Sequence, residues 1–277
     1  MRVLVCGAAG MLGQDLVRAA ELANHEVTAT SRLECDVTDR ARVDRTVRSA
    51  RPDVVVNCAA YTDVDGAERE PEAAMRVNAE GARNVAGAAA DQAAAVLYVS
   101  TDYVFDGRKG SLYVESDEPN PLSSYGASKL AGEVDTAVAN PRHYIVRSSW
   151  LFGTAGGNFV ETMLDLGGRQ SQVVVVRDQV GSPTYTAHLA EGLMRLIDTG
   201  TFGLHHMAAG GQCSWYDFAV AIFGRVGADC RVLSTTTDEL GRPAPRPRFS
   251  VLATQYDDAI HLPDWSEGLD DYLAELG

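Results

Sequence analysis

Lysine is almost absent from this sequence of 277 residues. Only Lys109 and Lys129 are lysines, and the chain has 24 basic residues against 38 acidic ones, a formal net charge of −14. A protein that binds a polyanion needs clustered Lys and Arg to neutralise phosphates, and such a cluster is missing. The composition therefore argues against nucleic acid as a partner and leaves only local positive sites.

Two explanations of the acidic, lysine-poor composition remain open. An acidic surface suits a protein that works at high salt, where the repulsion between like charges is screened. A GC-rich coding preference would also favour Arg and Ala over Lys. We favour the salt-adapted source, which predicts that stability depends on the KCl concentration.

Long apolar runs and paired cysteines are also missing. No apolar run approaches the ~20 residues that a membrane-spanning helix needs. The five cysteines are odd in number and show neither a CxxC motif nor a spacing with His that suits a metal. We therefore expect reduced thiols in a packed core, and a protein of the cytoplasm that contacts no membrane.

Short apolar segments alternate with helical patterns through the first half of the chain. Apolar runs that resemble buried parallel strands occupy residues 1–6, 25–30, 53–57, 95–99 and 143–147. Helical spacing is present at 11–23, 39–50, 72–90 and 124–139. Because right-handed crossovers cover both faces of such a sheet, the alternation predicts an α/β fold with a doubly wound, Rossmann-like parallel sheet.

The rhythm loosens after Trp150. A strand at 172–176 and a helix at 188–198 are expected to extend the first sheet, while the proline-rich stretch 242–248 cannot continue a helix. We therefore predict a dinucleotide-binding domain of residues 1–150 and about 171–200. Residues of about 151–170 and 201–277 would form a smaller α+β substrate-binding lobe, with a cleft between the two.

Gly7, Gly10 and Gly13 form a GxxGxxG pattern between the first strand and the first helix. Glycines at this place permit a tight turn, a close approach of backbone N–H groups to a pyrophosphate, and close packing of the helix. An ordinary strand-to-helix turn is the alternative. The position in a βαβ unit favours a dinucleotide site.

The end of the second strand indicates which dinucleotide is bound. An NAD site usually has an acid there, but the chain has Arg32, which can meet a 2′-phosphate and so favours NADP. Arg32 as an ordinary surface residue is the alternative. Asp36 and Val37 could frame the adenine, unless Asp36 only caps the helix near Asp39.

Tyr125 and Lys129 stand four residues apart in a predicted helix, so both can face one ligand. A cation fixed beside a phenol favours the phenolate and brings proton transfer toward neutral pH. An exposed Tyr and Lys on a solvated helix is the alternative. Against it, Lys129 is one of two lysines in a chain that otherwise uses Arg, whose broad guanidinium would replace an ammonium poorly.

Thr101 stands at the carboxyl end of the fourth strand, the edge at which open α/β sheets bind ligands. Its hydroxyl could donate to a substrate carbonyl, or it could cap the turn that follows. Together with Tyr125 and Lys129 it favours the catalytic role.

These features resemble the extended short-chain dehydrogenase/reductase family along nearly the whole chain. The segments STDYVFDG (100–107), RSSW (147–150) and DQVGSPT (178–184) are similar in particular to the dTDP-4-dehydrorhamnose reductase branch. The stretch LPDW (262–265) adds to this match.

The resemblance implies a reaction and a set of residues. NADPH or NADH would deliver hydride to C4 of a dTDP-4-keto-6-deoxyhexose while Thr101 polarises the carbonyl, Tyr125 protonates the alkoxide, and Lys129 holds the ribose and lowers the phenol pKa. Further implied cofactor positions are Met11, Leu12, Ala59, Ala60 and Tyr61. Implied substrate positions are Asp102, Tyr103, Trp150 and Arg246, where Trp150 could instead be a core aromatic and Arg246 could only pair with acids.

Departures from the family and competing functions complete the hypothesis. Some members bind magnesium through glutamates at a dimer contact, but this chain has Asp15 and then Ala187 where a second acid is expected, so no metal is predicted. His205, His206 and Glu191 are interpreted as structural. A homodimer is compatible with the family. The alternatives are a reductase of another nucleotide-linked 4-keto sugar, or a non-catalytic regulatory subunit resembling that of methionine adenosyltransferase.

Overall fold

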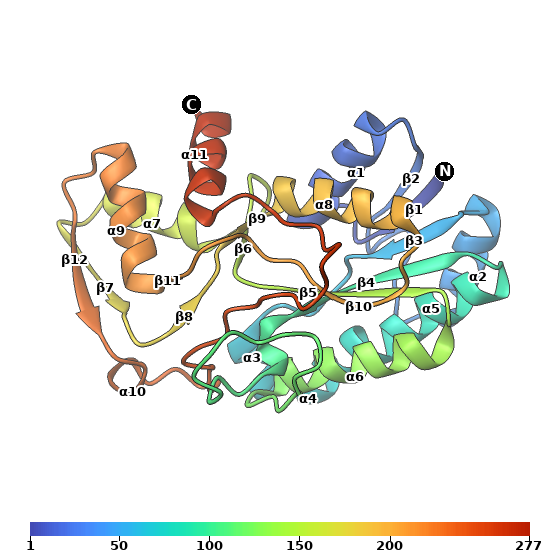
Figure 1. The fold of residues 1–277 in the computed structure, drawn as a ribbon, viewed down its shortest axis with the longest axis horizontal. Coiled ribbons are helices and arrows are strands. Elements are labelled where there is room, and N and C mark those ends of the chain that lie inside the picture. The colour runs from blue at the N-terminus through green and yellow to red at the C-terminus, as the bar shows by residue number, and fades with distance from the viewer.

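A computed structural model describes residues 1–277, and its centre is one six-stranded parallel sheet (Figure 1). The strands stand in the order β10-β5-β4-β3-β1-β2, the order of a doubly wound fold. Their bounds are β1 (Arg2–Cys6), β2 (Glu26–Thr30), β3 (Val54–Asn57), β4 (Ala95–Thr101), β5 (His143–Ser148) and β10 (Gly203–His206). The predicted Rossmann-like sheet is confirmed.

Helices cover both faces of this sheet (Figure 1). The strands alternate their side chains between two cores: Val3 and Val5 face one cluster, Leu4 and Cys6 the other. The first cluster is covered by α1 (Met11–Leu22) and α8 (Thr186–Thr199), and the second by α2 (Arg40–Ala50) and α5 (Gly81–Asp91), beside α6 (Ser124–Ala139).

The helix expected at 72–90 is interrupted. The chain forms α3 (Val64–Arg69), α4 (Pro71–Met75), a π-helical turn η1 (Arg76–Glu80) and then α5. Asn78 in the π-turn is fully buried, accepts from Tyr61 N–H (2.8 Å) and donates to Ser128 Oγ (2.9 Å). Single π-turns are frequent beside functional sites, and this one ties the loop after β3 to α6.

The second lobe has its own apolar core. Helices α7 (Phe159–Gly167), α9 (Trp215–Val226) and α11 (Trp265–Leu276) pack around β7 (Gln172–Val176), which pairs in parallel with β12 (Arg231–Thr235). Smaller elements complete the lobe and its junction: β6 (Leu151–Phe152), β8 (Val180–Gly181), β9 (Thr184–Tyr185), β11 (Cys213–Ser214), α10 (Thr237–Leu240) and the short 3₁₀ turn η2 (Asp102–Val104).

One part of the predicted architecture is wrong. The strand at 172–176 does not extend the main sheet but pairs with β12 in the second lobe, and the sixth strand of the main sheet is β10, from the segment assigned to the small lobe. An apolar strand pattern shows that a strand is buried, not which edge it joins. The predicted helix at 188–198 does pack on the first domain, as α8.

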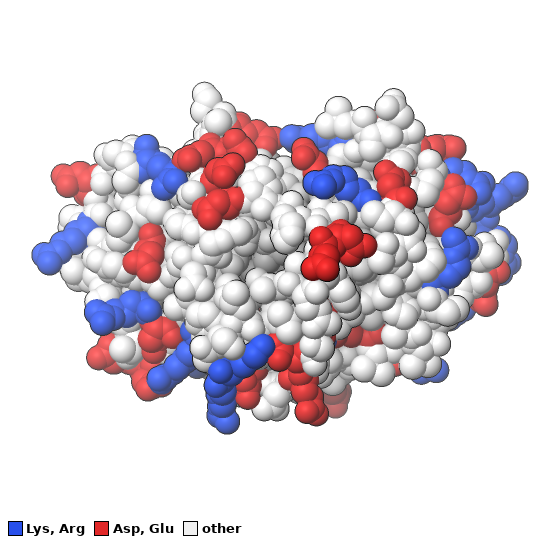
Figure 2. Space-filling view, viewed as in Figure 1, with Lys and Arg blue, Asp and Glu red and all other residues white.

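No helix is long and apolar enough to cross a membrane. On the face shown in Figure 2, acidic and basic side chains are interspersed around the outline, while the middle carries mostly uncharged residues. Most ion pairs have at least one well-exposed partner, so the surface charges are largely solvated. The pair Glu133–Arg147 differs, because both of its side chains are buried.

Candidate active site at the carboxyl edge of the sheet

A cavity of about 640 Å³ lies where the carboxyl ends of the central strands meet the second lobe. Its walls come from the glycine turn before α1, the segment after β3, the ends of β4 and β5, the first turns of α6, and Trp215 of the second lobe. Thr101, Tyr125 and Lys129, from separate elements, all line it. The structure therefore brings the three predicted catalytic residues to one cavity.

Thr101 is the last residue of β4 and is buried. Its hydroxyl oxygen accepts from Tyr103 N–H (3.2 Å), which is the turn-capping role considered above, and its O–H donates to Asp102 Oδ1 (3.2 Å). The cap leaves the hydroxyl at the cavity wall. The cap uses the hydroxyl oxygen as acceptor, so it is compatible with donation to a substrate carbonyl once the O–H turns from Asp102 to the substrate.

Tyr125 stands in the first turn of α6, whose N-cap Ser123 accepts from Gly126 N–H (3.1 Å). An added Cβ on Gly126 would lie 2.2 Å from Tyr103 O, so glycine lets the helix approach the end of β4 closely. The Tyr103 ring meets the Tyr125 ring edge-on at 5.9 Å. Backbone packing thus sets where the phenol stands.

The acidities of the pair differ from the expectation. Burial raises the pKa of Tyr125 to about 12, against a smaller opposite effect of the hydrogen bond with Thr101. Burial lowers the pKa of Lys129 to about 7, while Glu133 works in the opposite direction. The pKa of the phenol is thus raised overall and not lowered as predicted, because desolvation dominates both groups, and the Lys129 ammonium donates to Val99 O (2.6 Å).

The glycine turn forms a cradle that fits a pyrophosphate. An added Cβ on Gly13 would lie 2.3 Å from Gly7 O, and one on Gly7 would lie 2.7 Å from Ala59 N. Helix α1 has Gly10 as its N-cap, with no side-chain cap and no acid in its first turn. Its first N–H groups and its dipole are therefore available to an anion.

A second cavity of about 260 Å³ continues from this turn. It shares Gly10, Ala59 and Ala60 with the larger cavity, so the two are contiguous. All the predicted cofactor residues line one or both: Gly7, Gly10, Arg32, Asp36, Val37, Ala59, Ala60 and Tyr61 the smaller one, and Gly10, Met11, Leu12, Gly13, Ala59, Ala60, Tyr125 and Lys129 the larger one.

Arg32 and Asp36 lie side by side on the wall of the smaller cavity. The Arg32 side chain is 83% exposed and its Nε lies 3.6 Å from Asp36 Oδ2. Asp36 Oδ1 accepts from both the N–H (3.0 Å) and the hydroxyl (2.8 Å) of Thr38, while Asp39 is the residue that caps α2. Asp36 therefore shapes the turn before α2 and also lines the cavity.

Trp150 lines the larger cavity in a strained backbone conformation. Its φ is +49°, a region that bulky side chains rarely adopt. Its indole stacks on that of Trp215 at 3.6 Å between ring centroids and 3° between planes, and an added Cβ on Gly181 would meet it at 2.4 Å. The indole is thus held at the boundary between the two lobes.

Asp102 and Tyr103 also line the larger cavity, whereas Arg246 does not. Arg246 Nη1 donates to Asp65 Oδ1 (3.0 Å), the pairing with an acid that we considered as its alternative role. Although burial alone would raise the pKa of Asp65, the bonds from Arg246 and from Ala244 N–H lower it to about 2. Asp102 is 1% exposed and accepts from Ser250 Oγ (2.5 Å).

Sequence reasoning missed Trp215. It stands 65 positions after Trp150, in the second lobe, and no local spacing connects the two. The only signal was that it is one of three tryptophans, beside the predicted lobe boundary.

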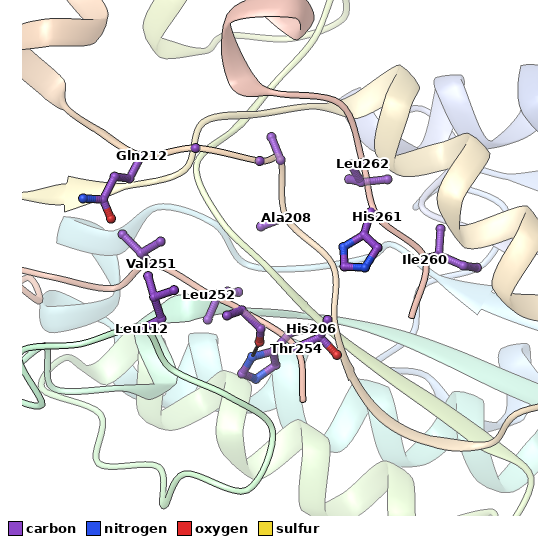
Figure 3. A pocket seen from close by; sticks show the side chains of 14 residues that line it. Leu112, His206, Ala208, Gln212, Val251, Leu252, Thr254, Ile260, His261 and Leu262 are labelled. Atoms are coloured by element: carbon purple, nitrogen blue, oxygen red, sulfur yellow. Dashed lines mark hydrogen bonds between the residues drawn. The ribbon is translucent and has the colours of Figure 1, made fainter. Parts of the chain in front are cut away.

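A further cavity of about 460 Å³ lies beside the loop that follows β10 (Figure 3). Its walls include His206, His261 and several apolar side chains, and none of the predicted site residues belongs to them. The rings of His205 and His206 bond to the backbone carbonyls of Thr201, and of Tyr113 and Ala253, respectively. The structure contains no group of three or more His, Cys, Asp or Glu side chains suited to a metal.

Comparison with known proteins identifies the family to which the chain belongs. A sequence profile described as the RmlD substrate binding domain matches residues 1–277. The chain belongs to this RmlD family. The match covers both lobes and all the site residues described above.

Relatives within the RmlD family are similar over nearly their whole length. The chain is 40% identical to the spore coat polysaccharide biosynthesis protein SpsK of Bacillus subtilis, over 99% of this chain and 97% of the relative. It is 44% identical to the dTDP-4-dehydrorhamnose reductase of Mycolicibacterium smegmatis, over 99% and 86%. A solved dTDP-4-dehydrorhamnose reductase of Bacillus anthracis, in complex with NADP, superposes with a TM-score of 0.96 at 39% identity and 99% coverage of both chains.

Proposed function

We propose that this RmlD-family chain is an NAD(P)H-dependent reductase of the C4 keto group of a dTDP-4-dehydro-6-deoxyhexose, which makes dTDP-L-rhamnose. The observation that carries the proposal is the meeting of Thr101, Tyr125 and Lys129 at one cavity that continues into the glycine cradle. The relatives named as dTDP-4-dehydrorhamnose reductases support the choice of substrate.

The bound dinucleotide supplies a hydride to the substrate carbon. Gly7, Gly10 and Gly13 would hold its pyrophosphate on the N-terminus of α1, and Lys129 would hold its ribose. Arg32, beside the smaller cavity, would meet a 2′-phosphate. The protein's own part is to orient both reactants and to provide the proton.

Tyr125 would provide that proton. A ketone reduced to an alkoxide needs an acid that is still protonated at neutral pH, and burial, which raises the pKa of Tyr125 to about 12, keeps the phenol in this form. The Thr101 hydroxyl, at the end of β4, would donate to the substrate oxygen as charge develops on it. Lys129 would stabilise the phenolate left after proton transfer.

Trp150 and Asp102 would contact the sugar, and the second lobe would close the cavity through Trp215. Tyr103 would contact the sugar as well, because its ring stands edge-on to that of Tyr125. Arg246 would reach the diphosphate only after its bond to Asp65 breaks.

The test is an assay of NADPH oxidation with a panel of dTDP-4-keto sugars, in which the decrease in NADPH absorbance is measured. Turnover with dTDP-4-dehydro-L-rhamnose and formation of dTDP-L-rhamnose are expected. Preference for another sugar would move the assignment to a different reductase, for which a relative named dTDP-4-keto-6-deoxy-D-glucose reductase, 41% identical, is a precedent. No turnover with any sugar, together with tight NADPH binding, would favour the regulatory-subunit alternative.

The cofactor preference can be tested at Arg32. Arg32→Ala should weaken NADPH binding about tenfold while leaving the Kd of NADH unchanged, because a charged hydrogen bond to the 2′-phosphate contributes roughly 1.5 kcal/mol or more. Titration of each cofactor against intrinsic fluorescence measures both constants. Arg169→Ala, which removes an exposed arginine of an ion pair far along the chain, serves as the control. Equal loss for both cofactors would contradict the role of Arg32.

We also propose that the enzyme works in the cytoplasm, without a metal, and as a monomer or a homodimer. Light scattering coupled to size exclusion would determine the oligomeric state. Dialysis against a chelator should leave the reductase rate unchanged.

A further inference from the structure

Three polar side chains meet in the buried core beside the active cavity. Arg147 donates from Nε to Glu133 Oε1 (2.9 Å) and from Nη2 to Oε2 (2.7 Å), and Ser100 Oγ donates to Glu133 Oε1 (2.5 Å). The side chains of Glu133 and Arg147 are only 6% and 3% exposed. One carboxylate therefore receives three hydrogen bonds away from bulk water.

Each member of this cluster is next to a part of the active site. Ser100 directly precedes Thr101 on β4, and Arg147 directly precedes Ser148, the last residue of β5, which lines the cavity. Glu133 is one helical turn after Lys129 on α6, so the two side chains lie on the same face of the helix. The cluster ties the helix that carries Lys129 to the two central strands.

Arg147 has its remaining contacts satisfied elsewhere. Its guanidinium lies 5.0 Å from the Phe105 ring centroid, and Nη1 lies 3.5 Å from His206 Nε2. His206 Nδ1 lies 2.9 Å from Ala253 O, so Nδ1 carries the proton and Nε2 accepts from Arg147. Arg147 is thus fixed from both sides and holds Glu133 in place.

Stability alone does not explain a buried ion pair. Removing two charges from water is costly, and apolar replacements of such pairs are often neutral or stabilising. The position of this pair suggests a different role, because Lys129 is also buried and needs a counter-charge.

Lys129 has one anionic neighbour. The groups that face it are Cys58 at the end of β3, the Tyr98 ring of β4 (4.1 Å from Nζ to the centroid), and Tyr125 and Glu133 of its own helix. Burial raises the pKa of Cys58 to about 12 and that of Tyr98 well above its usual value, so both are neutral at pH 7. Tyr125 is neutral as well, which leaves the Glu133 carboxylate.

We propose that Glu133 is a positioning residue for Lys129: its carboxylate, fixed by Arg147 and Ser100, keeps the buried ammonium charged beside the cavity. The effect of Glu133 on the Lys129 titration is independent of the proposed function; only its effect on the reductase rate rests on that function. Without the carboxylate, Lys129 keeps its bond to Val99 O and its contact with the Tyr98 ring but loses the anionic charge that opposes its desolvation, and it gives up its proton at lower pH. A neutral Lys129 would stabilise neither the ribose contact nor a phenolate.

The two-lysine composition permits a direct measurement. Protein labelled with ¹³Cε-lysine should show two side-chain signals, and Lys109→Arg identifies that of Lys129. Titration should place Lys129 near neutral pH in the unsubstituted chain and about one pH unit or more lower in Glu133→Gln, which keeps the shape of the side chain. The Lys109 signal and the matched control Asp135→Asn, a half-buried acid on the same helix, should remain unchanged.

An unshifted Lys129 titration in folded Glu133→Gln would overturn the proposal. If that variant does not fold, Glu133→Asp, which shortens the side chain by one methylene and so moves the carboxylate, gives the same test with Arg147 left in place. In this variant too, a lower titration point supports the role of Glu133, and an unchanged one refutes it.

Enzyme kinetics give a second readout. In Glu133→Gln the fall of kcat with rising pH should begin at lower pH, by the shift that the lysine signal shows, whereas a merely structural defect would lower kcat at every pH equally. If the unsubstituted chain reduces no dTDP-4-keto sugar, the proposed function fails, and the lysine titration still decides the role of Glu133.

Discussion

Tyr125 is the residue whose chemistry can be isolated most cleanly. Tyr125→Phe removes one oxygen and the donated proton, so kcat should fall by about 10²–10⁴-fold while the Kd of NADPH changes little. Stopped-flow turnover and a cofactor titration measure the two effects separately. Tyr256→Phe, at an exposed tyrosine outside the site, should keep full activity. A fully active Tyr125→Phe would mean that another group supplies the proton.

The buried carboxyl of Asp102 is expected to lower the free energy of unfolding as pH rises. Burial raises its pKa from 3.8 to about 7, so the folded state holds a proton that the unfolded state releases, and stability falls as pH rises from about 4 through 7. Asp102→Asn removes this cost and should stabilise the fold at pH 8 by on the order of a few kcal/mol, but not at pH 4. Denaturant unfolding at both pH values measures this. Equal effects at the two pH values would contradict it.

Some residues of the site could be predicted from spacing and others could not. Tyr125 and Lys129 are four apart on one helix, so their common cavity follows from helical geometry. Their pKa directions do not, because desolvation depends on what covers each side chain, and it outweighs the effect expected from the neighbouring charge. Trp215 reaches the cavity from the second lobe, and no local pattern contains that contact.

The turn before α1 depends on the absence of a side chain at Gly13. Gly13→Ala would place a Cβ 2.3 Å from Gly7 O and 2.8 Å from Ala8 Cα, so the turn must open. We expect loss of NADPH affinity by at least about tenfold, measured by titration, because the N–H groups would leave the positions that face the pyrophosphate.

Gly224 provides the matched control in α9. An added Cβ there meets nothing within 4 Å, so Gly224→Ala should leave NADPH binding unchanged and raise stability by roughly 0.5–1 kcal/mol. Unchanged NADPH affinity in Gly13→Ala would remove the cradle from the proposed site.

The elements of the first domain were predictable because each strand and helix carries its own period. The helix at 72–90 was predicted as continuous. Its π-turn could not be predicted, because the turn places Asn78 against Tyr61 and Ser128, which are distant in the sequence. Burial patterns also did not distinguish β7 from β10 as partner of β5.

The whole molecule carries a net charge of −14, and its repulsion should respond to salt. KCl at 1 M screens charges beyond about 3 Å, so we expect Tm to rise by several degrees relative to dilute buffer. Exposed pairs such as Arg2–Asp53 are screened too, but each contributes little. Near the isoelectric point of about 4.8 the salt effect should vanish. An unchanged Tm at pH 8 would contradict salt adaptation.

Local order along the chain was determined by the sequence itself. The alternation of strands and helices follows from the hydrophobic pattern, the glycine turn from glycines spaced three residues apart, and the pairing of Tyr125 with Lys129 from their spacing of four residues. Only the tertiary structure decided which strand became the sixth of the main sheet, that Trp150 stacks on Trp215, and that Glu133 is held beside Lys129 by Arg147. The reason is that a periodic pattern records which side of an element is buried, whereas its partner and the resulting desolvation depend on residues far away in the chain.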